Sequence, residues 1–510
     1  MTKFELPIVE MPVPASPASI RIHPSDSVAV ALRLLRAGEQ VTCDDLTVTI
    51  AADIPQGHKF ALRDHPLNAA VTKYGAQIGR ATTRILAGTQ VHSHNLATAL
   101  AGEIVYDPAE RIVLSASATS QPQPVWNGYR RSDGRFATRN EVWILPTVGC
   151  VGMTAEQVAR DAQARHAGKI DGIHAFTHPH GCSQLGDDLD GTRAALAGLA
   201  CNPNAAGVLL LGLGCESNQL DALIAAVPVD YRGKVLVLSS QAAGDELAAS
   251  AALVDELVEQ AALARREPAP FSALTIGLKC GGSDGLSGLT ANPLLGRLSD
   301  HLAAAGGTPI LTEIPEIFGA ENSLLRRAVD EPTFEAASGL INRFKRYYID
   351  QGLPVSENPS PGNLAGGITT LEEKSLGAVQ KAGSAPLCAV VDYGQQARGG
   401  GLALLEAPGN DAVSSTALAA AGATLILFTT GRGTPLGFPV PTLKVASNRA
   451  LAEAKPHWID FDASRMLDET ADSVDAAFLD CVLAAASGQP CAAERSGQRA
   501  IAIWKRGVTL

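Results

Sequence analysis

After Gly128 the chain consists of short, nearly continuous apolar runs that alternate with alanine-rich segments, and this alternation limits the possible folds most strongly. The runs stand at 141–150, 171–182, 206–216, 233–241, 272–285, 308–319, 386–394 and 424–435. Continuous apolar strands separated by helices are typical of a parallel sheet that is covered on both faces. In such folds ligands bind outside the carboxyl ends of the strands.

The pattern divides the chain into five parts. Residues 20–97 alternate apolar with polar residues and break at Gly, Pro and Asp, which predicts a compact β module. Residues 1–19 are rich in proline and are interpreted as a tail, and residues 98–126, which include "SQPQP", as a linker. Because 510 residues exceed one ordinary core, the α/β body is divided into domains at 127–270 and 271–510. The expected fold class is therefore a multidomain α/β protein with an N-terminal β module.

Charge and hydropathy exclude several function classes. The net charge of −11 comes without a basic tract, which argues against nucleic acid or anionic membranes as partners and leaves small acids held by a few local cations. No apolar run reaches the ~18 residues of a membrane span. The first residues make a poor signal peptide, and nine scattered cysteines indicate reduced thiols, so a cytoplasmic location is expected.

Four cysteines stand directly after apolar runs. They are Cys150, Cys182, Cys215 and Cys280, each beside a glycine. If the runs are parallel strands, these thiols emerge on one rim of the sheet or sheets. A single cysteine in this setting is best explained as a small packing residue, whereas four together favour a thiolate site. The other five cysteines are interpreted as packing residues.

Long motifs place the chain near a known family. The segments "GHKFAL", "VHSHN", "GCSQLGDD", "GLGCESNQ", "CGGSDGLSGLTANPLLGR", "TEIPEIFGAE", "ENPSPGNLAGGITTLEEKSLG" and "HWIDFDA" resemble the altronate dehydratase family, in that order. The resemblance runs from about Ile20 to Leu510. Galactarate dehydratases share "GHK" and "CGGSD" but are less similar in "VHSHN" and "HWIDFDA". The first module resembles the SAF domain, a β-clip fold.

The resemblance implies removal of water from D-altronate to give 2-dehydro-3-deoxy-D-gluconate, within hexuronate breakdown. It also implies Fe²⁺ as the usual metal, without saying which residues hold it. Dehydration of a 2,3-dihydroxy acid requires loss of the C2 proton and of the C3 hydroxyl. The intermediate carries two negative charges on one carboxylate, so a metal and cationic donors are needed to stabilise it.

Two groups of residues are candidates for iron. The first is the four thiols, with His178 and His180 just upstream of Cys182; three cysteines could hold an iron–sulfur cluster with one iron open to substrate. The second is "VHSHN", where His92 and His94 are expected on one face of a strand, aided by His23 or His58. A mononuclear Fe²⁺ and a cluster both remain open, and so does a polar strand edge for the histidines.

The catalytic and substrate-binding candidates follow from the required chemistry. Lys59, His58 and Lys374 are candidate bases, and Glu313 and Glu316 are candidate acids or metal-side groups. Arg432 in "TTGRGTP" suits a carboxylate, because it follows a strand in a glycine-loosened segment. The candidates for contact with the substrate's carboxylate and hydroxyl groups are Thr430, Thr434, Ser283, Asp284, Asn292 and Asn410.

Several functions remain open at this stage. The first is a hydro-lyase for D-altronate that acts on a free sugar acid, with a homo-oligomer as a possible assembly. Its alternatives are a galactarate dehydratase, a related lyase that eliminates sulfite, and a non-catalytic sugar-acid binding protein. Metal content separates the last from the others, because a binding module needs no thiol and imidazole groups.

Overall fold

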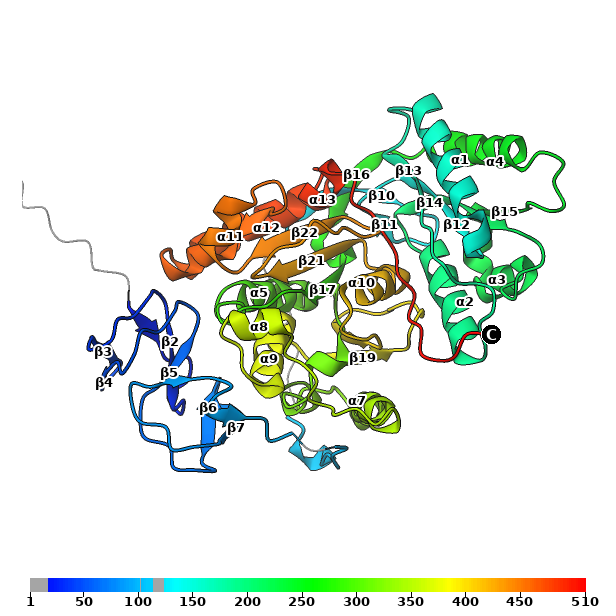
Figure 1. The fold of residues 1–510 in the computed structure, drawn as a ribbon. Coiled ribbons are helices and arrows are strands. Elements are labelled where there is room, and N and C mark those ends of the chain that lie inside the picture. The colour runs from blue at the N-terminus through cyan, green and yellow to red at the C-terminus, as the bar shows by residue number, and fades with distance from the viewer. Residues whose placement is uncertain (1–16, 101, 113–122) are drawn as a thin grey trace, which may run out of the picture.

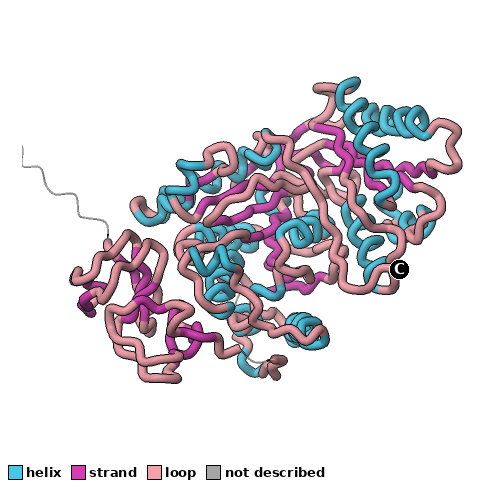
Figure 2. The backbone as a smooth tube through the Cα atoms, in the orientation of Figure 1, coloured by secondary structure: helices cyan, strands magenta, loops and turns pink. Residues whose placement is uncertain are grey.

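The structure, a computed structural model, describes residues 17–100, 102–112 and 123–510. Most of the predicted tail and part of the predicted linker lie outside these residues. The described chain forms an N-terminal β module, a first α/β domain and a larger second α/β domain (Figures 1 and 2). The prediction of a β module followed by a body with parallel sheets is confirmed.

The β module contains two small antiparallel sheets and a hairpin. One sheet has the order β1 (Ser19–Ile20), β2 (Val28–Ala31), β5 (Lys59–Ala61), β8 (Gln90–Val91), and the other has β6 (Ala70–Lys73), β7 (Ala76–Ala81), β9 (Leu96–Ala97). The hairpin joins β3 (Gln40–Cys43) to β4 (Leu46–Thr49). Tyr74 and Gly75, at φ 60° and 74°, form the two-residue turn between β6 and β7, where positive φ at both positions matches the strand twist.

The first α/β domain has a four-stranded parallel sheet of order β13-β12-β14-β15. Its strands are β12 (Glu141–Pro146), β13 (Gly172–Ala175), β14 (Ala205–Gly212) and β15 (Val235–Ser239), and its helices are α1 (Gly152–Arg165), α2 (Asp187–Ala200), α3 (Leu220–Ala226) and α4 (Glu246–Ala261). Alternate side chains of β12 enter different cores: Val142 packs with α1 and α4, whereas Trp143 packs in the main core with α2. Helices therefore cover both faces of the sheet.

The second α/β domain has a seven-stranded parallel sheet of order β19-β20-β18-β17-β21-β22-β23. The strands are β17 (Thr275–Cys280), β18 (Thr308–Leu311), β19 (Leu387–Val391), β20 (Leu402–Leu405), β21 (Leu425–Thr430), β22 (Thr442–Ala446) and β23 (Phe461–Asp462). The helices are α5 (Ala291–Ala304), α6 (Asn322–Leu325), α7 (Glu331–Asp350), α8 (Pro361–Ala365), α9 (Leu371–Ala378), α10 (Asp411–Ala420), α11 (Arg449–Ala454), α12 (Ala471–Ala486) and α13 (Ala492–Arg495). Gly277 on β17 faces Leu418 of α10, so this helix lies directly on the sheet.

Two segments cross the predicted domain boundaries. The antiparallel sheet β11 (Phe136–Ala137), β10 (Val125–Arg130), β16 (Arg266–Pro270) lies between the α/β domains, so a strand begins inside the predicted linker. The C-terminal segment runs from α13 back to α2 of the first domain, where Leu510 N–H donates to the Ser183 carbonyl at 3.0 Å (Figure 1). Residues that close the chain thus join the two domains.

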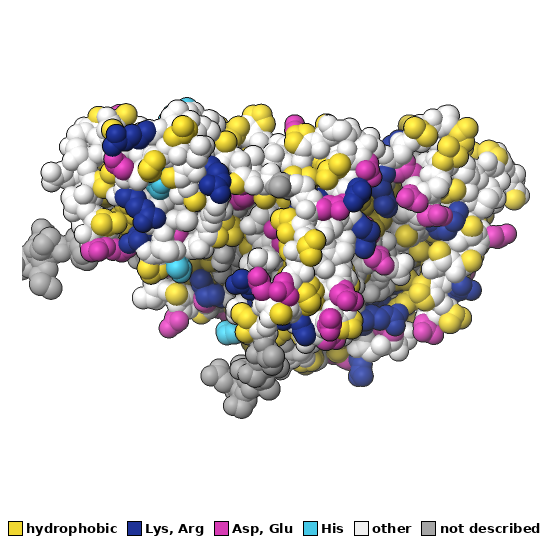
Figure 3. All heavy atoms as spheres, turned by 90° about the horizontal axis from the view of Figure 1, so that it is seen from below, with side chains coloured by type: hydrophobic (Ala, Val, Ile, Leu, Met, Phe, Trp, Pro, Cys, Tyr) yellow, Lys and Arg dark blue, Asp and Glu magenta, His cyan; other side chains and the backbone are white. Residues whose placement is uncertain are grey.

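Charged side chains of both signs lie on the surface. Basic and acidic side chains are interspersed over the face shown in Figure 3. Among the described residues, no helix combines the length and the apolar character needed to cross a bilayer.

A buried ion network fixes the β module to the body. Lys59 on β5 and Lys73 on β6 both bind Glu373 of α9, with Nζ–Oε distances of 2.7 and 2.8 Å, and all three side chains are buried. Burial alone would raise the pKa of Glu373, but the two ammonium groups outweigh it and lower the pKa to about 2. The network therefore stabilises the docked module only while Glu373 is ionised.

Replacement of Glu373 by Gln is expected to weaken this docking by roughly 3–5 kcal/mol, because it leaves two buried cations without a counter-charge. Native-state hydrogen exchange of the β5 amides measures the loss. The same measurement across pH should show the stabilisation intact above pH 4.5, the ordinary pKa of a glutamate, and lost as the pH falls toward 2.

Asp468→Asn is the matched control, because Asp468 pairs with Arg449 on the surface, where ion pairs contribute less than about 1 kcal/mol. Equal, small effects of the two substitutions on β5 exchange would contradict the role given to Glu373.

Candidate active site

The topology of the larger sheet opens a crevice beside β17. From β17 the chain continues to the neighbouring β18, and it returns to the other side of β17 only at β21. The connections after β17 and β21 therefore leave in opposite directions, and ligands bind at such a switch point in open α/β sheets. Cys280 ends β17 and Thr430 ends β21, so both lie at this crevice.

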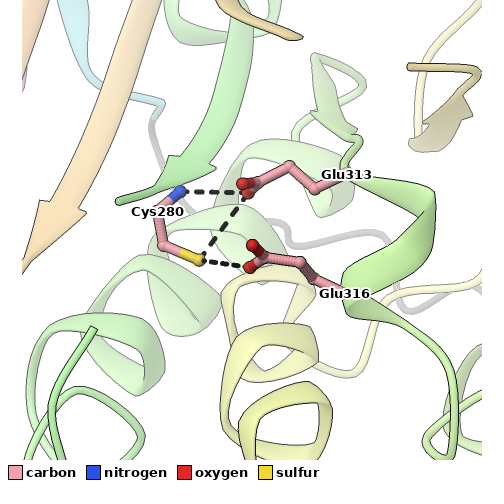
Figure 4. Close-up of side chains that lie close together, drawn as sticks. All are labelled: Cys280, Glu313 and Glu316. Carbon is pink, nitrogen blue, oxygen red and sulfur yellow. Dashed lines mark hydrogen bonds between the residues drawn. The ribbon is translucent and has the colours of Figure 1, made fainter. Parts of the chain in front are cut away.

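A thiol and two carboxylates meet beside the end of β17 (Figure 4). Cys280 Sγ lies 3.6 Å from Glu313 Oε2 and 3.5 Å from Glu316 Oε2, and the Cys280 N–H donates to Glu313 Oε2 at 3.0 Å. All three residues are buried. Glu313 has a left-handed backbone (φ 66°), an unfavourable conformation for a residue with a side chain and one that clusters at functional sites.

Three buried lysines surround these groups. Lys381 Nζ donates to Cys280 Sγ at 2.7 Å and to Glu313 Oε2 at 3.2 Å. Lys374 Nζ donates to Glu316 Oε1 at 2.8 Å, and Lys279 Nζ donates to Glu313 Oε1 and, at 2.8 Å, to Asp411 Oδ1. We call Cys280, Glu313, Glu316, Lys279, Lys374, Lys381 and Asp411 the lysine–carboxylate group.

The charges of this group balance without a metal. Its three ammonium groups match the carboxylates of Glu313, Glu316 and Asp411, and burial, the largest cause, raises the pKa of the Cys280 thiol to about 12. Among the described residues, only Cys280, Glu313 and Glu316 have three ligand atoms within 4.8 Å of one another. Both oxygens of Glu313 already accept N–H bonds, and even with the Cys280 thiol deprotonated a dication would leave one uncompensated charge in a buried site. These residues do not fit the expected iron.

Solvent reaches the group at one edge. The side chains of Asp411 and Asn358 are partly exposed there, and Asn358 Oδ1 accepts from Lys374 at 3.1 Å. Arg432 is exposed near this edge, and its Nη2 donates to the Gly362 carbonyl at 3.1 Å. A Cβ added to Gly282 would lie 3.1 Å from the Cβ of Arg432, so the arginine packs on this glycine. The guanidinium, which has five N–H donors, thus lies beside the glycine backbone that follows Cys280, where it can also bind a carboxylate.

Several predicted substrate contacts have structural partners instead. Asp284 accepts hydrogen bonds from Ser287, Ser447 and Asn448 and ties the loop after β17 to the one after β22. Asn292 is buried and links Thr429 to the Gly377 carbonyl.

The other predicted contacts divide in the same way. Asn410 caps α10, and Thr434 holds its own turn by accepting from the Leu436 N–H. Thr430, the last residue of β21, accepts from the Gly433 N–H, and the carbonyl of Ser283, in the loop after β17, accepts from Asn363; both residues are buried. Asp284, Asn292, Asn410 and Thr434 thus have structural partners, and their contact with the substrate stays a prediction.

The candidate bases Lys59 and His58 lie at the β-module interface. Burial, the largest cause, lowers the pKa of Lys59 to about 8, but its Nζ is enclosed by Glu373, Thr369 and Gly367. His58 stacks on His92 with ring centroids 5.4 Å apart, and His92 Nε2 contacts the Leu364 carbonyl at 3.0 Å. These residues dock the module against the segment that carries α8.

The histidine motif differs from the prediction. β8 ends at Val91, and His92–Asn95 form a turn, because the His92 carbonyl accepts from the N–H groups of Asn95 and Leu96. His94 is therefore exposed instead of sharing a strand face with His92. His23 is also exposed and packs against Gly75, so the four histidines do not form one metal site.

The four thiols fall into two places. Cys150, Cys182 and Cys215 are exposed and follow the adjacent strands β12, β13 and β14 of the first domain. Cys280 belongs to the other sheet and is buried. The expectation of a common rim thus holds for three cysteines and fails for Cys280, because the apolar runs build two separate sheets, one in each predicted α/β domain, and Cys280 ends a strand of the second.

Sequence reasoning missed Lys279, Lys381 and Glu373. Lys279 offered a signal, since a charged residue inside the apolar run "ALTIGLKC" has to be paired when it is buried. Lys381 in "GAVQKAG" and Glu373 in "LEEKSLG" offered none, because helical lysines and glutamates are ordinarily solvated.

The burial of Cys280 predicts a graded thiol reactivity. With a pKa raised to about 12, Cys280 should resist iodoacetamide at pH 8 in the folded, metal-free protein, whereas the exposed Cys150, Cys182 and Cys215 should react. Peptide mass spectrometry of the alkylated protein measures this. Alkylation of Cys280 as fast as that of the exposed three would contradict the enclosed site.

Family models match all three structural parts. The altronate/galactarate dehydratase SAF domain matches residues 17–99, the D-galactarate dehydratase/altronate hydrolase second domain matches 128–262, and the D-galactarate/altronate dehydratase C-terminal domain matches 271–509. The C-terminal model includes every residue of the lysine–carboxylate group.

Curated relatives match almost the whole chain. Altronate dehydratases of Bacillus subtilis (strain 168) and Escherichia coli (strain K12) are each 47% identical over 496 residues, which cover 96% of this chain and 99% of theirs. The galactarate dehydratase (L-threo-forming) of Escherichia coli (strain K12) is 32% identical over 504 residues, 92% of this chain and 93% of its own. The chain belongs to the altronate/galactarate dehydratase family.

Proposed function

We propose that this protein is a hydro-lyase that converts D-altronate to 2-dehydro-3-deoxy-D-gluconate at the crevice between β17 and β21. The observation that carries the proposal is the placement of Arg432 beside a buried group of lysines and carboxylates. The greater identity to altronate dehydratases, 47% against 32% for the galactarate enzyme, supports altronate as the substrate.

Arg432 binds the substrate carboxylate, and the lysines stabilise its second negative charge. Removal of the C2 proton produces a dianionic intermediate, so cations that are fixed before the reaction lower its energy most. Nearby carboxylates, after the opposing effect of burial, raise the pKa of Lys279, Lys374 and Lys381, which keeps all three protonated for this role.

Glu316 and Lys374 act as base and acid. Burial alone would raise the pKa of Glu316, but Lys374 and its neighbours outweigh it and lower it, so the carboxylate is ionised and takes the C2 proton. Lys374 gives a proton to the C3 hydroxyl, which leaves as water, and the enol becomes the 2-keto acid. Because Lys374 Nζ donates to Glu316 Oε1 at 2.8 Å, the proton held by Glu316 can return to Lys374. Lys374 thus acts as an acid and not as the base first expected.

The proposal is tested by turnover. The purified protein should release a 2-keto-3-deoxy acid from D-altronate, and Arg432→Ala should lower kcat/KM about 10- to 100-fold, since a charge-assisted hydrogen bond contributes roughly 1.5–3 kcal/mol. Arg449→Ala, which removes an exposed arginine of α11, is the control and should stay within a few-fold of wild type. Equal activity of all three proteins, or turnover of galactarate alone, would overturn the assignment.

The roles of Glu316 and Lys374 separate in an exchange experiment. In D₂O, Glu316→Gln should lose both turnover and exchange of the C2 proton of D-altronate, by about 10²-fold or more. Lys374→Met should lose turnover but keep exchange, because proton removal precedes departure of the hydroxyl. Nuclear magnetic resonance of the recovered substrate measures the exchange, and full exchange in Glu316→Gln would exclude it as the base.

A further inference from the structure

Three loops of the first α/β domain carry the same dipeptide at equivalent places. Gly149–Cys150, Gly181–Cys182 and Gly214–Cys215 follow β12, β13 and β14, which are neighbours in the order β13-β12-β14. Parallel strands are about 4.8 Å apart, so the three loops leave the sheet side by side at its carboxyl edge. No residue of the lysine–carboxylate group belongs to these loops.

Hydrogen bonds lock the three loops to one another. Gly149 N–H donates to the His180 carbonyl at 3.0 Å, and Asn218 N–H donates to the Gly181 carbonyl at 2.9 Å. Thr147 Oγ1 donates to Glu216 Oε1, which joins the first loop to the third. The thiols are thus presented by a fixed frame.

The glycines are required by the close approach of these loops. A Cβ on Gly181 would lie 2.1 Å from the Thr147 carbonyl oxygen, and one on Gly214 would lie 2.8 Å from Gln241 Oε1. Both glycines also have positive φ, 103° and 128°. Cys182 and Cys215 are therefore each preceded by a position that requires glycine.

The three thiols are unusual in their exposure. Free cysteines are among the most buried residues of proteins, yet Cys150, Cys182 and Cys215 are all exposed, while Cys43, Cys201 and Cys491 are buried. Polar groups beside them lack partners: Gln184 Nε2 and Asn218 Oδ1 are buried without a hydrogen bond among the described residues. Three exposed thiols next to unsatisfied polar atoms indicate that a ligand completes this site.

The spacing favours a cluster over a single ion. A metal–sulfur bond of about 2.3 Å places two thiolates on one ion within roughly 4.6 Å of each other. Among the described residues, these cysteines do not form a group with ligand atoms within 4.8 Å. Iron–sulfur clusters are held by cysteine side chains, and the loops after three adjacent strands of this sheet supply three of them.

We propose that Cys150, Cys182 and Cys215 hold an iron–sulfur cluster on the carboxyl edge of the first α/β sheet. Each thiol loses one proton as it binds an iron, and three cysteines leave one iron of a four-iron cluster without a protein thiolate. The fit of iron to these loops, and its misfit at Cys280, place the metal of this chain outside the lysine–carboxylate group. The inference does not depend on the reaction that this group performs.

The test is metal and sulfide analysis of protein purified without oxygen. Wild type should contain iron and acid-labile sulfide in about equal amounts, near four of each per chain, with a visible absorption band that dithionite bleaches. Cys150→Ser, Cys182→Ser and Cys215→Ser should each lose most of the iron and sulfide together. Cys388→Ser, a half-buried thiol of β19, and Cys280→Ser should keep both.

A measurement on the wild-type protein tests the same site even if a serine variant fails to fold. In the loaded protein, iodoacetamide should spare Cys150, Cys182 and Cys215, and removal of iron by a chelator should make all three reactive while Cys388 is unchanged. Zinc without sulfide, iron without sulfide, or undiminished iron and sulfide in the three serine variants would overturn the proposal. Turnover of D-altronate is assayed separately, so failure of the cluster and failure of the proposed reaction are distinguishable.

Discussion

Helix α9 carries two adjacent buried charges on which the assembly of the molecule depends. Glu373 binds Lys59 and Lys73 of the β module, and Lys374 binds Glu316 at the crevice. A buried charge is tolerated only when its partner is in place, so both networks have to form when the helix docks. The same helix therefore couples attachment of the N-terminal module to the geometry of the lysine–carboxylate group.

Charge balance also decides what the crevice can do. Lysines with raised pKa values next to ionised carboxylates form a neutral set that can stabilise a dianionic intermediate and pass a proton within itself. A divalent ion would disturb this balance, whereas three exposed thiols on the other sheet offer the soft ligands that iron prefers. We therefore propose that the two sheets divide proton transfer and metal binding between them.

Much of the fold could be predicted from the sequence, because apolar runs that alternate with helical segments are typical of parallel sheets. The positions of Cys280, Glu313 and Arg432 at strand ends were readable for the same reason. The roles of Lys381 and Glu373 could not be predicted. Lys381 pairs with Cys280 across 101 residues and Glu373 pairs with Lys59 across 314, so both pairs depend on how separate elements pack. The strand expected at His92–His94 failed because a turn, set by bonds to the His92 carbonyl, replaces it.

The most direct test of the central claim is a crystal structure of the protein with 3-deoxy-D-altronate, which lacks the leaving hydroxyl. The account predicts that its carboxylate binds Arg432 and that C2 lies within hydrogen-bonding distance of Glu316, at the edge formed by Asn358 and Asp411. An analogue bound at the cysteine loops of the first α/β domain, with an empty crevice at β17 and β21, would contradict it.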